Sequence, residues 1–165
     1  MLVLDGSQGI TYPVTAGSTS TLQAGSSKVL QVIQSSLTTS QSTAGGVLIS
    51  SNLSASITPT SSTSKILIMV NGGKTYAAAN SLLYCQMYRN GSTLGSSVSW
   101  VPIEIGGAQV GSAQHSFSYL DSPATTSSIT YTPYYRNYGS TCYFLDYGAT
   151  PAYGAVTLTL MEIAA

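Results

Sequence analysis

The sequence predicts an all-β protein: an antiparallel β-sandwich of jelly-roll type, preceded by a short N-terminal hairpin or arm. Short runs rich in Val, Ile, Thr and Tyr recur along the chain, and such residues favour strands. Segments rich in Gly, Ser, Pro and Asn separate these runs and supply turns. No stretch carries a helical period over a useful length, so two packed antiparallel sheets are the expected solution.

Composition favours a folded chain that works in an assembly. The 165 residues suit one domain, and 43% are hydrophobic, which is enough to form a core. Only 6% are charged, against about 25% in an average protein. Five basic and five acidic side chains give a net charge of zero, which argues against nucleic acid and against an anionic membrane surface. A neutral chain is also poorly protected from self-association, so its normal state is expected to be assembled.

The N-terminal part divides from the rest at residue 27. The stretch "LVLDGSQGITYPV" at 2–14 predicts two short strands around a Gly-containing turn. The polar segment "TAGSTSTLQAGSS" at 15–27 is typical of a linker or an extended arm. A hairpin of this size is marginal alone, so we expect residues 1–27 to dock onto another chain. Residues 28–165 then form the sandwich domain.

About nine strands are expected from Lys28 onward. They are "KVLQVIQS", "GVLISSNLSASI", "KILIMVNG", "SLLYCQMYRNG", "SVSWVPIEIGG", "QHSFSYLD", "SITYTPYYRN", "TCYFLDYG" and "AVTLTLMEI". Asn90-Gly91 is the strongest short hairpin signal. The run "ILIMV" at 66–70 predicts a strand covered on both faces, and it is far too short to span a membrane. The regular last strand is expected to be central, with a bulge near Met161.

Catalytic and metal-binding motifs are missing from the sequence. His115 is the only histidine, and alternation places it on one face with Phe117, Tyr119 and Asp121, which indicates a structural role. Asp121-Ser122-Pro123 is interpreted as a turn opener. No nucleophile elbow, phosphate loop or zinc spacing occurs. We therefore predict no enzyme activity, no catalytic residue, no metal and no cofactor.

Two further sets of residues leave alternatives open. Cys85 and Cys142 are expected to be buried free thiols, and a bridge is possible only if their strands are neighbours. A glycan depolymerase, a minor alternative, needs two carboxylates that converge. The acidic residues available for that role are Asp5, Glu104, Asp121, Asp146 and Glu162.

Tyrosines gather in the last third of the chain, where they can serve packing or binding. In "ITYTPYYRN" alternation places Ile129, Tyr131, Pro133 and Tyr135 on one face and Thr130, Thr132 and Tyr134 on the other. Tyrosine combines an apolar ring with a hydroxyl, which suits both subunit interfaces and sugar stacking. Packing is expected for most of these rings. The receptor-binding candidates are Tyr134, Tyr135, Arg136 and Tyr138.

Several phrases resemble short tail-fibre-like and virion structural proteins of tailed bacteriophages. The opening "LVLDGSQGITYP" and the segments "KVLQVIQ", "LSASITPTSSTSKILIMVNG", "YRNGS", "YLDSPATTSSITYTPYYRN" and "VTLTLMEIAA" carry the resemblance. It implies a homotrimer of β-sandwich heads, mounted on another virion structural protein by the N-terminal segment. Leu2, Leu4, Ile10 and Tyr12 are the anchor candidates within that segment.

The expected function is a short tail fibre, or receptor-binding protein, that attaches to host cell-surface glycan. The alternative is a capsid decoration protein, either a cement or a head fibre, that stabilises the phage head. In both cases the protein resides in the virion, on the tail or the capsid surface. No secretory signal is recognisable, so synthesis in the host bacterial cytoplasm is expected, without membrane insertion.

Overall fold

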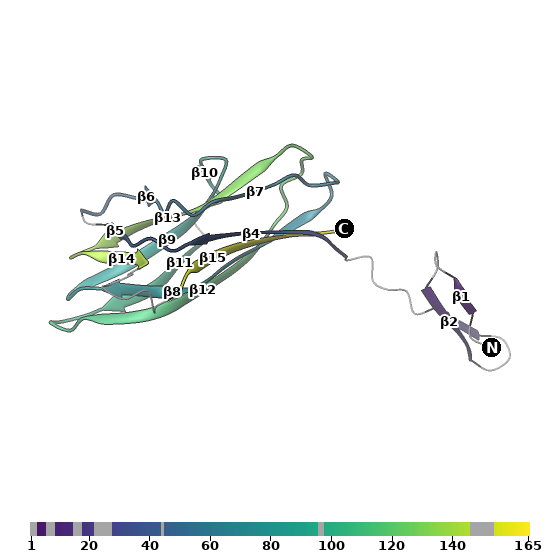
Figure 1. Ribbon diagram of the computed structural model, residues 1–165, viewed down its shortest axis with the longest axis horizontal. Coiled ribbons are helices and arrows are strands. Elements are labelled where there is room, and N and C mark those ends of the chain that lie inside the picture. Colours follow the sequence, from purple (N-terminus) through teal and green to yellow (C-terminus); the bar gives the residue numbers. More distant parts are fainter. Residues whose placement is uncertain are drawn as a thin grey trace.

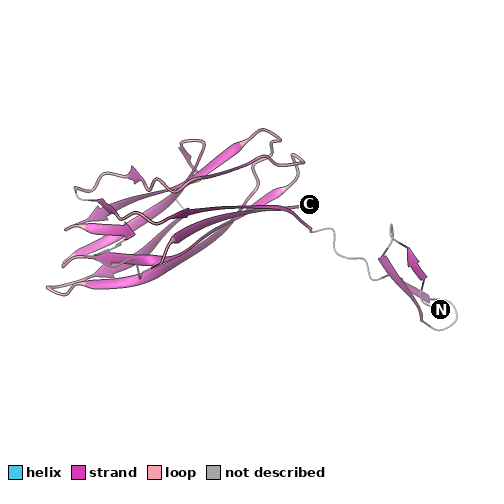
Figure 2. Cartoon of the chain, viewed as in Figure 1, coloured by secondary structure: helices cyan, strands magenta, loops and turns pink. Residues whose placement is uncertain are grey.

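The computed structural model describes residues 3–5, 9–14, 18–21, 28–43, 45–95, 98–145 and 154–165, with side chains from residue 28 onward. These ranges form strands joined by turns and bends, and none of the ranges contains a helix (Figures 1 and 2). Accordingly, these ranges contain no helix long and apolar enough to cross a membrane. The all-β prediction is confirmed.

Fifteen strands form three sheets in the described residues. The small N-terminal sheet consists of β1 (Val3–Asp5), β2 (Gly9–Val14) and β3 (Ser18–Thr21). The second, here called sheet I, contains β4 (Val29–Leu37), β5 (Gln41–Thr43), β8 (Lys65–Ala77), β12 (Gly111–Asp121), β14 (Cys142–Leu145) and β15 (Val156–Ile163). The third, sheet II, contains β6 (Ile49–Ser50), β7 (Ala55–Ile57), β9 (Ser81–Arg89), β10 (Ser92–Thr93), β11 (Ser99–Ile105) and β13 (Ile129–Tyr138).

The strand order is that of a jelly roll. Sheet I runs β12-β8-β15-β4, and sheet II runs β11-β9-β13-β7, with every pairing antiparallel. Strands β14 and β5 extend sheet I beyond β15 and β4, while β10 and β6 extend the two edges of sheet II. Apart from β9, β10 and β11, which follow one another within sheet II, successive strands from β7 to β13 cross from one sheet to the other, and the strand order is that of two interlocked Greek keys. Among the nine expected strands, "GVLISSNLSASI" splits into β6 and β7, and β5 and β10 were not anticipated.

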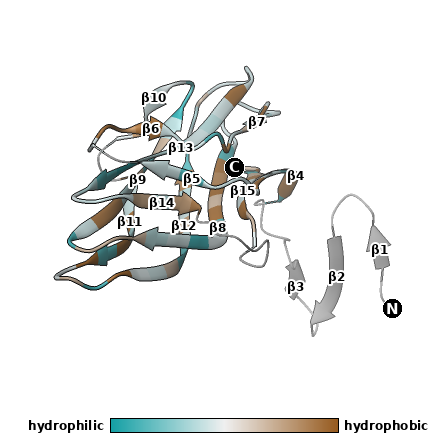
Figure 3. Cartoon of the chain, turned by 60° about the vertical axis from the view of Figure 1, so that its left-hand side comes forward, coloured by the Kyte–Doolittle hydropathy of each residue, from teal (hydrophilic) through white to brown (hydrophobic). Residues whose placement is uncertain are grey.

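Alternating side chains fill the space between the sheets. Along β13 every odd-numbered residue from Ile129 to Asn137 is buried, as the sequence pattern predicts. Figure 3 shows the same alternation as hydrophobic and hydrophilic bands along the strands of both sheets. On one side of the sandwich Trp100 of β11 stacks on Phe117 of β12, with ring centroids 4.3 Å apart, so the two sheet edges meet there. The core is continuous from sheet I to sheet II.

The last strand is central in its sheet, as expected. β15 lies between β4 and β8, and its pairing with β4 shifts register between Glu162 and Ile163, next to the bulge expected at Met161. The inward Glu162 carboxylate there accepts hydrogen bonds from Gln31 Nε2, Thr60 N and Thr60 Oγ1, each at 2.7 Å. Burial alone would favour the protonated acid, but these hydrogen bonds outweigh it and lower the pKa of Glu162 to about 2. Glu162 thereby fastens the β7–β8 loop to the end of the sandwich.

The N-terminal region contains more regular structure than a hairpin and linker. β1 pairs with β2 from Val3↔Thr11 to Asp5↔Gly9. β3 then pairs with β2, so a strand lies within 15–27, where a linker was expected. The anchor candidates Leu4 (β1), Ile10 and Tyr12 (both β2) belong to this sheet, and Leu2 lies outside the described residues.

One partly buried ionic cluster joins sheet I to sheet II. Arg89 Nη1 of β9 lies 2.7 Å from Asp121 Oδ2 of β12, and the Tyr131 hydroxyl of β13 donates to the same oxygen at 2.6 Å. Burial and the adjacent carboxylate raise the pKa of Tyr131 well above its ordinary value, so the phenol keeps its proton. The expectation that Asp121 serves as a turn opener was incomplete. Asp121 is 6% exposed, and its carboxylate links strands of the two sheets.

Replacing Asp121→Asn is expected to destabilise the sandwich by about 2 kcal/mol, since a partly buried ion pair and a charge-assisted hydrogen bond are lost. Tyr131→Phe removes only the hydroxyl and should cost about 1 kcal/mol. Urea unfolding followed by tryptophan fluorescence measures both. Ser118→Ala, at an exposed site on the same strand, is the control and should leave the midpoint unchanged. Equal midpoints for Asp121→Asn and the control would contradict the role of the cluster.

Candidate ligand-binding surface

The outer side of sheet II carries aromatic side chains in register across two strands. Because odd-numbered residues of β9 and β13 point inward, their even-numbered residues face outward. Strand pairing brings Thr132 opposite Tyr88, Tyr134 opposite Gln86, and Arg136 opposite Tyr84. We call the outward set the tyrosine face, and its members are Tyr84, Tyr88, Tyr134, Arg136 and Tyr138.

Contacts within the tyrosine face order its rings. Tyr88 and Tyr134 stack with centroids 4.0 Å apart and an interplanar angle of 25°. The Arg136 guanidinium carbon lies 4.9 Å from the Tyr84 ring centroid and 4.5 Å from that of Tyr138. Cation–π contacts at such distances are attractive and stabilise the arrangement of exposed side chains. The face is therefore a preformed aromatic surface that carries one positive charge.

The four receptor-binding candidates lie on opposite sides of β13: three point outward and one points into the core. Tyr134 and Arg136 are partly exposed on the tyrosine face, and Tyr138 is 43% exposed. Tyr135 points into the core, stacks on Phe144 with centroids 5.3 Å apart and is 1% exposed. Burial, with a further effect of Cys85, raises the pKa of Tyr135 to about 12. The assignment of Tyr135 to a receptor contact was therefore wrong, and the alternation along β13 already gave the reason.

Three turns converge at one end of the sandwich, next to Tyr138. They are the β8–β9 turn at 78–80, the β11–β12 turn at 106–110 and the β13–β14 turn at 139–141. Asn80 N donates to Gly107 O at 3.0 Å, and Ala78 N donates to Thr141 O at 3.1 Å, so backbone hydrogen bonds hold the turns together. A Cβ at Gly139 would collide with the Asn80 carbonyl oxygen, so this close approach requires glycine.

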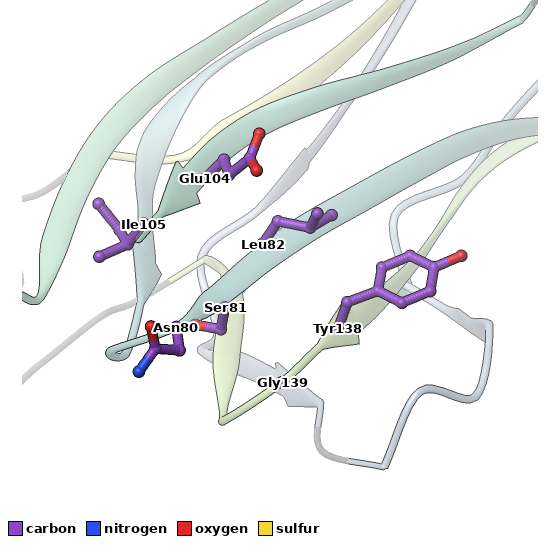
Figure 4. Close-up of a pocket in the computed structure, with 7 residues that line it drawn as sticks. All are labelled: Asn80, Ser81, Leu82, Glu104, Ile105, Tyr138 and Gly139. Carbon is purple, nitrogen blue, oxygen red and sulfur yellow. The ribbon is translucent and has the colours of Figure 1, made fainter. Parts of the chain in front are cut away.

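A shallow depression of about 180 Å³ lies at this junction, and we call it the end depression (Figure 4). It is lined by Asn80, Ser81, Leu82, Glu104, Ile105, Tyr138 and Gly139. Pairing places Leu82 of β9 between Tyr138 of β13 and Glu104 of β11, so these three side chains form one row across the outer face. Among the described residues of the lining, Glu104 is the only charged one.

Sequence reasoning singled out three members of the tyrosine face, Tyr134, Arg136 and Tyr138, and missed Tyr84 and Tyr88. Alternation in "SLLYCQMYRNG" would have placed Tyr84 and Tyr88 on one face with Leu82. Glu104 was considered only as a possible catalytic carboxylate. The end depression depends on turns distant in sequence, and no local pattern reports their convergence.

His115 and the two cysteines lie buried in the sandwich. His115 is buried, packs on Phe144 with centroids 4.9 Å apart, and burial lowers its pKa to about 4. Cys85 and Cys142 are buried free thiols, as expected, and burial together with Cys142 raises the pKa of Cys85. Within the described ranges no group of three or more His, Cys, Asp and Glu could hold a metal ion.

No family model matches the sequence, and no curated protein sequence matches it. Among solved structures, the chain is similar to VP2 of the infectious bursal disease virus subviral particle, with 14% identity and a TM-score of 0.44 over 81% of this chain and 39% of that one. Infectious bursal virus derived T=1 particles give 16% identity and a TM-score of 0.38 over 99% and 44%. This chain thus spans about two fifths of the length of these neighbours. Similarity this low does not establish a shared function.

His115 is expected to make the stability of the domain sensitive to acid. Neither ring nitrogen has a hydrogen-bond partner among the described residues, and the folded-state pKa of about 4 lies below the ordinary 6.5. The unfolded chain therefore binds a proton that the folded one rejects, and stability present above pH 6.5 is lost as the pH falls toward 4.

His115→Leu should flatten the pH dependence of the free energy of unfolding between pH 6.5 and 4. Urea titrations at several pH values measure this slope for wild type and variant. Because the ring nitrogens of His115 make no hydrogen bond among the described residues and leucine is of similar size, stability at pH 7 should change by less than about 1.5 kcal/mol. An unchanged slope in the variant would show that other groups cause the acid sensitivity.

Proposed function

We propose that this protein is a virion structural protein of a tailed bacteriophage, a short tail fibre that attaches to host cell-surface glycan through the tyrosine face. The observation that carries the proposal is the preformed aromatic surface on sheet II, with stacked Tyr88 and Tyr134 and with Arg136 between two rings. Tyrosine rings pack against the apolar faces of sugars, and their hydroxyls bond to sugar hydroxyls. The resemblance of several sequence phrases to phage tail-fibre-like proteins supports the virion role.

The outer side of sheet I supports assembly as a homotrimer. Pairing aligns four apolar residues in one row across four strands, which we call the apolar row: Leu120, Leu67, Met161 and Val32. Leu120 is 47% exposed and Val32 is 52% exposed. The sequence pattern of β8 predicts cover on both faces, yet Leu67 and Met69 remain only half-buried in a single chain. Exposed apolar rows of this kind mark association surfaces, and a sister subunit is the partner we propose.

The N-terminal segment 1–27 is the proposed attachment to another virion structural protein. Ala164 N donates to Lys28 O at 2.8 Å, so the sandwich begins and ends at the same end. β8 runs from Lys65, which pairs with Ile163 near that end, to the turn at 78–80 at the other (Figure 1). A chain held through residues 1–27 would present the end depression away from the attachment site.

A capsid decoration protein is the alternative within the same class, because an N-terminal attachment and a projecting sandwich suit both locations. Copy number in purified virions separates them. A few tens of copies or fewer support the tail fibre, while hundreds support decoration of the head.

Binding to host cells is expected to depend on the tyrosine face. Purified protein should adsorb to host cells and block infection, and Tyr88→Ala with Tyr134→Ala should weaken adsorption at least tenfold because stacking surface is lost. The matched control replaces Tyr76 and Tyr143, an edge-to-face pair on sheet I with centroids 5.7 Å apart. Wild-type protein that neither adsorbs nor blocks infection would refute the receptor-binding role.

Association is expected to depend on the apolar row. Val32→Asp together with Leu120→Asp should convert the trimer to monomer, because charges would be buried without partners in the interface. Light scattering after size exclusion measures the mass. Ser36→Asp, an exposed site on β4, is the control and should remain trimeric. A monomeric wild-type protein would refute the trimer itself.

A further inference from the structure

We propose that the end depression is a monosaccharide subsite that takes a neutral or amino sugar and rejects an acidic one. The inference rests on the proposed attachment to glycan and adds to it a location and a charge preference. It concerns Tyr138, Leu82 and Glu104, the row at the end of sheet II, and the turn that carries Asn80.

The depression is preformed by its backbone. Hydrogen bonds from Asn80 N to Gly107 O and from Ala78 N to Thr141 O fix three turns that come from distant parts of the sequence. Gly139 lets its turn lie directly against Asn80, and Ser81 Oγ donates to Ala78 O within the same corner. A ligand therefore meets a shape that needs no ordering, and weak contacts suffice to hold it.

The volume fits a single sugar ring. Sites for drug-sized molecules measure roughly 300–1,000 Å³. The depression, at about 180 Å³, is smaller and open to solvent. One ring in the depression would leave the rest of a glycan free to run along the tyrosine face, because Tyr138 belongs to both surfaces.

The lining offers the two kinds of contact that sugars need. Leu82 and the Tyr138 ring provide apolar surface for the C–H face of a pyranose. Ile105 also lines the depression, but its side chain packs against the core. The Asn80 amide and the Glu104 carboxylate provide hydrogen-bonding groups for its hydroxyls. Glu104 is exposed, and among the described residues it has no hydrogen-bond or ion-pair partner, so both carboxylate oxygens are available to a ligand.

Charge sets the preference among sugars. Glu104 is the only charged residue among the lining residues that the structure describes, so the carboxylate of a uronic acid would meet a like charge there. An ammonium or a neutral hydroxyl would instead donate to Glu104. Arg136 does not line the depression, and its guanidinium lies between the rings of Tyr84 and Tyr138.

The test is an NMR titration of the full-length protein with three probes: methyl β-D-glucopyranoside, D-glucosamine and D-glucuronate. The first two should shift the backbone amide signals of residues 80–82, 104–105 and 138–139, and glucuronate should not. Glu104→Gln keeps the shape and removes the charge. It should weaken glucosamine binding about tenfold and bring glucuronate to within about twofold of the glucoside. Tyr138→Ala should abolish binding of both accepted sugars, while Tyr76→Ala, on sheet I and outside the lining of the depression, should leave it intact.

The outcomes separate this inference from the proposed function. If wild-type protein adsorbs to host cells but none of the probes shifts the depression signals, the subsite is refuted and the adhesin role stands. Equal binding of glucuronate and glucosamine by wild-type protein refutes the charge preference. Sugar-dependent shifts in a protein that does not adsorb to host cells support the subsite and refute the adhesin role.

Discussion

The tyrosine face and the end depression depend on the hydrogen-bonded cluster of Arg89, Asp121 and Tyr131. Asp121 ends β12 in sheet I, and its carboxylate holds side chains from the two central strands of sheet II. Since side chains alternate along a strand, fixing Arg89 and Tyr131 inward fixes every even-numbered residue of β9 and β13 outward. A slip of one residue in either strand would turn its tyrosines into the core and expose its buried side chains. The tyrosine face thus follows from an ionic contact on the opposite side of the same strands.

Charged residues are few, and several of those that the structure describes make specific contacts. Asp121 and Glu162 are buried, and both accept hydrogen bonds that join segments distant in sequence. These carboxylates contribute little to the surface charge that keeps proteins apart. What remains on the outer side of sheet II is Arg136 between two rings and Glu104 in the end depression. The apolar row on the outer side of sheet I likewise contains no charged residue, and this favours association.

Local patterns predicted most strands and their inward and outward faces, because apolar and polar side chains alternate with a period of two along a strand. They placed His115, Phe117, Tyr119 and Asp121 on one face of β12, where the structure confirms that they point inward. They also implied that Tyr135 is buried, although it was chosen as a receptor contact. The partners of Asp121 could not be predicted, since Arg89 lies 32 residues away and reaches it only after the two sheets pack. Strands β5 and β10 are three and two residues long, too short for a pattern to register.

The proposed site and the proposed assembly depend on each other. A shallow, open depression of about 180 Å³ offers one sugar ring few contacts, so the affinity of a single site must be low. Useful attachment then requires several sites that act together, and linked copies raise the effective concentration of each site without any new contact. The apolar row would bring copies together on sheet I and leave sheet II, with its tyrosine face, unobstructed. Because the proposed association and the proposed binding would use opposite outer faces of one sandwich, neither would need to be weakened for the other.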